Sequence, residues 1–187
     1  MNVITLAGSP RLPSRSAALL TIAKRWLEGQ GIKVTPWSVF DFNPQDLLYA
    51  RFDSPSLKVF TGQLAQADGV IISTPIYKAS FSGALKTLLD LLPERAFEHK
   101  VVLPMATGGS VGHMLALDYA LKPVLNALKA QEILHGVFSE DSQITQYDSS
   151  PQLSGALENR LIESLETFTR ALERQSQFNA LSISSAL

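Results

Sequence analysis

Short apolar runs alternate with helical patterns five times along this chain of 187 residues, and that alternation constrains its fold more than any other feature. The runs are mostly continuous, as in strands that are buried on both faces of a parallel sheet. They occupy Val3–Ala7, Ile32–Trp37, Gly69–Thr74, Lys100–Ala106 and Glu132–Phe138. Because a helical pattern follows each run, we predict an α/β fold with a doubly wound, five-stranded parallel sheet in the strand order 2-1-3-4-5.

The helical patterns begin and end at typical capping and breaking residues. Ser14 precedes the first pattern, Gly29 ends it, and Pro93 stops the pattern that follows Ser82. The predicted helices cover Ser14–Gly29, Ser54–Ala67, Gly83–Leu92, His113–Ala130 and Leu153–Leu172. No repeat or linker divides the chain, so we expect one domain over residues 1–187, with a C-terminal tail from about residue 175.

Composition excludes several classes of function. The net charge of −1 provides no basic surface for nucleic acid, and the absence of cysteine rules out disulfides, iron–sulfur clusters, thiol catalysis and cysteine-based zinc sites. We expect no metal site. The first apolar run is too short for a signal peptide and no stretch is long enough to span a membrane, so we expect a cytoplasmic protein. A charged fraction of only 18% favours burial against another copy of the chain.

Three loops follow the carboxyl ends of predicted strands and have unusual compositions. They are "GSPRLPSRS" (Gly8–Ser16), "TPIYKASFSG" (Thr74–Gly83) and "ATGGSVGHM" (Ala106–Met114), called here the first, second and third loops. In the strand order 2-1-3-4-5 their strands are neighbours around the switch point, where doubly wound sheets bind ligands. We therefore expect the three loops to form one site.

The first loop has the composition of a monophosphate site. Its hydroxyl groups and the free backbone N–H groups of the following helix can donate to an anion, and its arginines can add charge-assisted bonds. The candidate residues are Ser9, Arg11, Ser14, Arg15 and Ser16. The loop is neither a Walker loop nor a GxGxxG motif, since Gly8 is its only glycine. An ordinary capped helix with solvated arginines is the alternative.

The other two loops suit a flat ligand. Gly108 and Gly109 allow a close approach to the backbone, and Tyr77, after Pro75, could contact a ring. Taken singly, these features also fit a plain turn and a packed tyrosine. A ligand with one terminal phosphate and a flat heteroaromatic end satisfies all three loops together, and flavin mononucleotide (FMN) is such a ligand.

The same segments resemble a known family. The phrases "AGSPRLPSRS", "TPIYKASFSGALKTLLDLLP" and "PMATGGSVGHMLALDYALKPVL" are similar to the flavodoxin-like NADPH-dependent FMN reductases, over about residues 1–147. They are closest to the reductase of the alkanesulfonate two-component monooxygenase systems. The resemblance implies a flavodoxin-like fold, with FMN and NADPH as cofactors. It implies that reduced flavin passes to a partner monooxygenase that desulfonates alkanesulfonates in sulfur acquisition.

By position, the resemblance also assigns site residues. The phosphate site falls on Ser9, Arg11, Ser14 and Ser16, and Arg15 is a candidate for phosphate or pyridine nucleotide. The flavin ring contacts fall on Pro75, Ile76, Tyr77, Lys78, Thr107, Gly108, Gly109 and Ser110. We assign no catalytic residue, because hydride passes directly from nicotinamide to flavin. His113, beside the third loop, is more typical of a surface or capping histidine.

Two other readings use the same cofactor. In one, FMN stays bound and the enzyme reduces quinones, azo dyes or metal ions. In the other, the chain is a flavodoxin-like electron carrier without an NADPH site. Such carriers are usually strongly acidic, which a net charge of −1 does not match.

Pro123 lies within the predicted helix His113–Ala130, where it cannot donate to the carbonyl of Tyr119 and its ring crowds that carbonyl. We predict a wide π-type turn over Leu117–Lys122. The resembled reductases have an additional tyrosine in a π-bulge at a subunit interface, and Tyr119 lies at the matching place. This predicts a homo-oligomer, a dimer or tetramer, with the Tyr119 helix at the contact. A proline-kinked core helix is the alternative.

Overall fold

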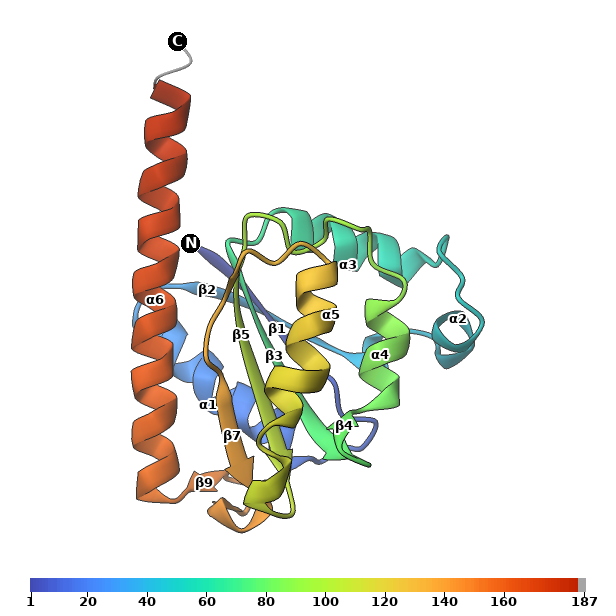
Figure 1. Ribbon diagram of the computed structural model, residues 1–187, viewed down its shortest axis with the longest axis vertical. Helices are drawn as coiled ribbons and strands as arrows, with labels where there is room; N and C mark the ends of the chain where they lie inside the picture. The colour runs from blue at the N-terminus through green and yellow to red at the C-terminus, as the bar shows by residue number, and fades with distance from the viewer. Residues whose placement is uncertain (185–187) are drawn as a thin grey trace.

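A computed structural model, which describes residues 1–184, has a parallel sheet at its centre with helices on both faces (Figure 1). The parallel strands are β1 (Asn2–Ala7), β2 (Lys33–Ser38), β3 (Gly69–Tyr77), β5 (Val101–Gly108), β6 (Glu132–Ile133) and β7 (Val137–Glu140). The order is β2-β1-β3-β5, and β6 and β7 both pair with the far edge of β5. With β6 and β7 counted as one interrupted strand, the predicted order 2-1-3-4-5 and the flavodoxin-like class are confirmed.

The fifth strand is interrupted where the sequence predicts a continuous one. Leu134, His135 and Gly136 separate β6 from β7, and Gly136 has a φ of +96°. A Cβ atom at Gly136 would lie 2.6 Å from the backbone oxygen of Pro104 in the neighbouring strand. The chain therefore passes β5 at a distance that only glycine permits, and regular pairing resumes at Val137.

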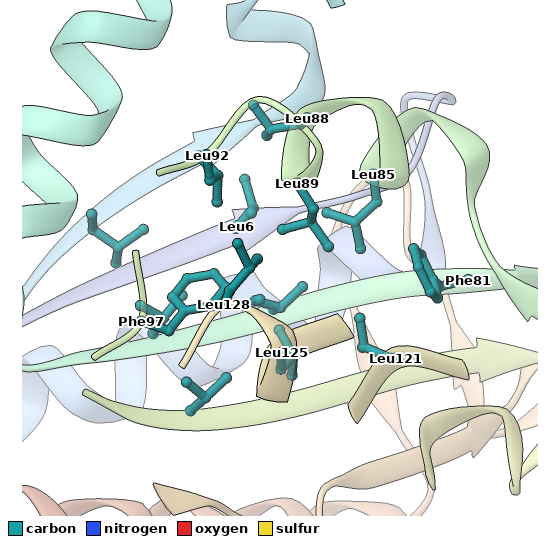
Figure 2. Close-up of a cluster of buried hydrophobic side chains, with 14 of the residues drawn as sticks. Leu6, Phe81, Leu85, Leu88, Leu89, Leu92, Phe97, Leu121, Leu125 and Leu128 are labelled. Atoms are coloured by element: carbon teal, nitrogen blue, oxygen red, sulfur yellow. The ribbon is translucent and has the colours of Figure 1, made fainter. Parts of the chain in front are cut away.

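Helices on the two faces bury two separate apolar cores. One face carries α1 (Arg15–Gly29) and α6 (Gly155–Ser184), and the other carries α3 (Pro55–Ala65), α4 (Gly83–Leu89), a π-helix (Leu117–Leu121) and α5 (Lys122–Ala127). Figure 2 shows part of the second core, where leucines of α4 and α5 point towards Leu6 of β1. Both sheet faces are thus covered, which explains why the central strands β3 and β5 are buried along almost their whole length.

The remaining elements are short. They are the 3-10 helices Val39–Asp41, Val111–His113 and Asp141–Gln143, the helix α2 (Pro44–Leu48), and the strands β4 (Ser80–Phe81), β8 (Ile144–Thr145) and β9 (Gln152–Leu153). The strand β4 folds back antiparallel on the end of β3, through a turn in which Lys78 and Ala79 have positive φ. This hairpin extends β3 to Tyr77, beyond its predicted end at Thr74.

The predicted wide turn is confirmed. Leu117–Leu121 is a π-helix, and α5 begins at Lys122 with Pro123 in its first turn. In that position proline needs no backbone donor, so the π-helix removes the conflict that Pro123 would create inside a regular helix. Leu117 and Leu121 are buried, whereas 80% of the Tyr119 side chain is exposed.

The final helix is longer than its apolar pattern predicts. The helix α6 runs from Gly155 to Ser184 and does not end at Leu172, and its last turns project beyond the rest of the molecule (Figure 1). The segment predicted as a C-terminal tail from about residue 175 continues this helix as far as Ser184, and residues 185–187 lie outside the described residues. Within residues 1–184, no helix combines the length and hydropathy of a membrane span.

Lys100 is a buried charge at the edge of the sheet where β5 begins. Its ammonium group donates to the backbone oxygen of Ala67 at 3.0 Å. Burial lowers the pKa of Lys100 from its usual 10.5, and the nearby Asp68 carboxylate opposes this only in part.

We therefore expect stability to rise with pH between the lowered pKa of folded Lys100 and 10.5. Over that interval the unfolded chain binds more protons than the folded chain does. The variant Lys100→Met should lack this part of the rise. Urea unfolding at a series of alkaline pH values measures it, and parallel pH profiles for the two proteins would contradict the assignment.

Candidate functional site

The three loops meet at the carboxyl edge of the sheet and line one cleft of about 180 Å³. A fourth segment, which follows β7, completes its wall. The lining residues are Ser9, Arg11, Pro13, Ser14, Arg15, Ser16, Pro75, Tyr77, Thr107, Asp141 and Tyr147. The cleft therefore contains all five candidates of the first loop, two of the second and one of the third.

Serine hydroxyls give the first loop its shape. The hydroxyl of Ser9 donates to the backbone oxygen of Arg11 at 3.0 Å and accepts from its N–H at 3.1 Å. Ser14 caps α1 by accepting from the N–H of Ala17 at 3.1 Å, and its Oγ lies 3.3 Å from the Oγ of Ser16. Ser9 is thus a loop-forming residue, whereas the Ser14–Ser16 pair retains a hydroxyl proton for a ligand.

Gly8 begins the first loop under close packing. A Cβ at this position would lie 2.9 Å from Cδ2 of Leu85 in α4. The N–H of Gly8 donates to the Ser73 oxygen at 2.8 Å, and the buried Ser82 hydroxyl donates to the Gly8 oxygen while capping α4. Hydrogen bonds therefore connect the start of the first loop to β3 and to the N-terminus of α4.

Some residues of the second loop line the cleft, and one is buried in the core. Pro75 and Tyr77 line the cleft, whereas Ile76 is buried in the core beside Phe81. Side chains alternate along a strand, so the extension of β3 to Tyr77 turns Ile76 away from the cleft. Lys78 is exposed in the hairpin turn and does not line the cleft.

The third loop supplies one side chain to the cleft. Thr107 is buried and lines it, but Gly108, Gly109 and Ser110 do not. A Cβ at Gly108 would lie 3.3 Å from Nδ1 of His113, so the imidazole packs against the backbone there. Gly109 and Ser110 are exposed beyond it. Nδ1 of His113 is buried without a hydrogen-bond partner.

Asp141 and Tyr147 are cleft residues that the sequence analysis missed. They follow β7, the last strand of the sheet, whose carboxyl end lies beside that of β5, the neighbour of β3. The ring of Tyr147 lies under the Arg15 guanidinium, with 4.4 Å between the guanidinium carbon and the ring centroid. Nε of Arg15 is buried without a hydrogen-bond partner. The available signal was position, since this segment leaves the same sheet edge as the other loops.

Charge and hydrogen bonding in the cleft suit an anion. The cleft is lined by two arginines, Arg11 and Arg15, and by one carboxylate, Asp141, and α1 begins in its wall at Arg15. Backbone N–H groups at a helix N-terminus carry partial positive charge. A terminal phosphate matches these donors in size and charge.

The comparisons with known proteins all indicate the same family. Residues 1–145 match the family described as NADPH-dependent FMN reductase. The chain is 65% identical over 175 residues to the FMN reductase (NADPH) of Escherichia coli strain K12, covering 94% of this chain and 92% of that one. It is 60% identical over 177 residues to the FMN reductase (NADPH) of Pseudomonas putida strain KT2440, covering 94% and 90%. The crystal structure of the NADH:FMN oxidoreductase EMOB in its apo form superimposes with a TM-score of 0.82 at 33% identity, covering 91% and 89%.

Proposed function

The chain belongs to the NADPH-dependent FMN reductase family, and we propose that its cleft holds the phosphate of FMN, with the flavin ring against the second and third loops. Its activity is the reduction of FMN by NADPH. The proposal concerns which residues bind the flavin and what becomes of it once reduced.

The phosphate assignment depends mainly on one observation. Arg15 extends into the cleft with Nε buried and unpartnered, beside the hydroxyls of Ser14 and Ser16 and the open N-terminus of α1. A buried donor without a partner is costly, and a phosphate oxygen would supply the partner. Arg11, exposed at the rim of the cleft, adds a second positive charge. Ser9 contributes by holding the loop.

The ring assignment uses the other two loops. Pro75, Tyr77 and Thr107 present side chains to the cleft, and Ile76 can contribute only its backbone because its side chain lies in the core. Lys78, Gly108, Gly109 and Ser110 adjoin the cleft without lining it. We assign the exposed members of this group, Lys78, Gly109 and Ser110, to contact with the nicotinamide nucleotide as it approaches the flavin from solvent.

The chain's own part in the reaction is alignment. Bound FMN supplies the redox chemistry, since flavin accepts hydride directly from nicotinamide. The phosphate donors would hold one end of FMN and the strand-end residues would hold the other, so the chain would orient the flavin for hydride transfer. No side chain needs to move a proton, and we assign no such role to His113.

We propose that the reduced flavin passes to a partner monooxygenase that desulfonates alkanesulfonates. This assignment is supported by the segments 85–96 and 116–138, which resemble the reductases of those two-component systems. We also propose that the protein acts in the cytoplasm. We also propose a single domain over residues 1–187 and a homo-oligomer. The exposed Tyr119 on the π-helix, near exposed Val111, Met114 and Leu115, supports a subunit contact at that helix.

The initial rate of NADPH oxidation by gel-filtered protein, measured while FMN is varied, tests the proposed function. We expect almost no oxidation without FMN and saturation at micromolar FMN, because flavin is a substrate that leaves after reduction. A protein that stays yellow and reduces quinone at a rate independent of added FMN would be a reductase with prosthetic flavin. No oxidation under either condition would leave an electron carrier.

A further inference from the structure

Tyr147 and Arg15 form a stacked pair whose function goes beyond the general binding of FMN. We infer that Tyr147 is a positioning residue, which holds the Arg15 guanidinium in the orientation that receives the flavin phosphate. This inference rests on the proposed function, since it takes the cleft to be the phosphate site. It makes Tyr147 a determinant of the preference for FMN over flavins that lack a phosphate.

The geometry of stacking supports this role. A guanidinium is planar and its N–H donors point outward within that plane, so an aromatic ring on its face leaves the donors free. The Tyr147 centroid lies 4.4 Å from the guanidinium carbon, and Nε of Arg15 has no hydrogen-bond partner. A carboxylate partner would instead occupy the donors that a phosphate needs.

Arg15 also lacks a competing ion pair. Asp141 lines the same cleft, yet none of the ion pairs found among the described residues includes Arg15. The ring of Tyr147 is therefore the contact that fixes the guanidinium while its charge remains available. Fixing it in advance lowers the conformational entropy that phosphate binding would otherwise cost.

The segment that carries Tyr147 is itself held firmly. Gln146 adopts a φ of +47° and turns the chain between β8 and Tyr147, and β8 pairs with β9 through Ile144 and Leu153. Ile144 is buried in the core against α1 and α6, and Tyr147 packs against the same core. The backbone N–H of Ser154 donates to the Gln143 oxygen at 2.9 Å, which closes the base of this hairpin. The ring is thus presented from a fixed support.

The test compares dissociation constants for FMN and riboflavin, because the ratio isolates the phosphate. For Tyr147→Leu, which keeps apolar packing but removes the π face, we expect FMN to bind about tenfold more weakly and riboflavin to bind within about twofold of the original chain. Tyr147→Phe should restore FMN binding. Arg15→Ala should weaken FMN alone, and adding Tyr147→Leu to it should cause no further loss. Matching circular dichroism spectra confirm that the variants fold.

Each alternative outcome is informative. Equal weakening of FMN and riboflavin by Tyr147→Leu would show that the ring contacts the flavin or supports the fold generally, and would overturn the inference. Unchanged binding of both ligands would overturn it as well, as would additive losses in the double variant. If Arg15→Ala leaves the ratio unchanged, the phosphate lies elsewhere and the proposed placement of FMN fails with it.

Discussion

Replacing Gly136 with alanine is expected to lower the free energy of unfolding by about 3–5 kcal/mol. Gly136 has a φ of +96°, a conformation that disfavours any side chain, and its added Cβ would lie 2.6 Å from the backbone oxygen of Pro104. A side-chain movement cannot relieve the contact, because the obstructing atom belongs to the backbone of β5, and the cost of the positive φ is a property of the local backbone. Urea unfolding measures the loss.

A glycine within a regular helix provides the matched control. Gly62 is within α3, with open space around the position of a Cβ, so Gly62→Ala should stabilise the chain by up to about 1 kcal/mol. Equal effects of the two substitutions would contradict the explanation. Because Gly136 precedes β7, which leads to Asp141 and Tyr147, Gly136→Ala should also weaken FMN binding.

Phe168→Ala is expected to cost a similar amount, about 3–5 kcal/mol, by opening a cavity between α6 and the sheet. The Phe168 side chain is 0% exposed. Its ring lies so close to the start of β3 that a Cβ at Gly69 would be 2.7 Å from Cζ. Thermal or urea unfolding gives the value.

Glu166→Ala provides the control on the same helix. Glu166 is exposed and its carboxylate is 3.9 Å from the Arg170 guanidinium, so its removal should change stability by less than about 0.5 kcal/mol. If the Phe168 variant were as mild as this control, α6 would contribute far less to the core than its burial indicates.

The sequence predicted the sheet well because burial on both faces leaves a strong signal in each strand. It failed where backbone geometry decides the outcome. The interruption at Gly136 depends on a contact with Pro104 of another strand, which no local pattern contains. The helix α6 continues beyond its apolar stripe because no proline or glycine follows Leu172. The segment between Ser38 and Ser54 was not predicted as helical because its short capped helices have no apolar periodicity. The π-helix was predictable because Pro123 creates a local conflict.

The candidate site was predictable in part for similar reasons. The first loop has many hydrogen-bond donors, and this composition indicates an anion site whatever the exact ends of the neighbouring strand and helix are. The buried position of the Ile76 side chain was not predictable, because β3 was expected to end at Thr74 and alternation along the longer strand turns this side chain into the core. Tyr147 carries no local signal, since its importance comes from Arg15, which is remote in sequence and adjacent only in the fold.

The cleft is lined by residues from four segments that are far apart in the sequence, and the last of them contains Asp141 and Tyr147. During synthesis, a nascent chain that has not yet released Tyr147 from the ribosome lacks one wall of the cleft, however well its first strands have formed. With FMN in this cleft, as proposed, flavin binds only after the segment of Asp141 and Tyr147 has joined the earlier loops. FMN would then stabilise chains whose cleft is complete and leave incomplete ones without that protection.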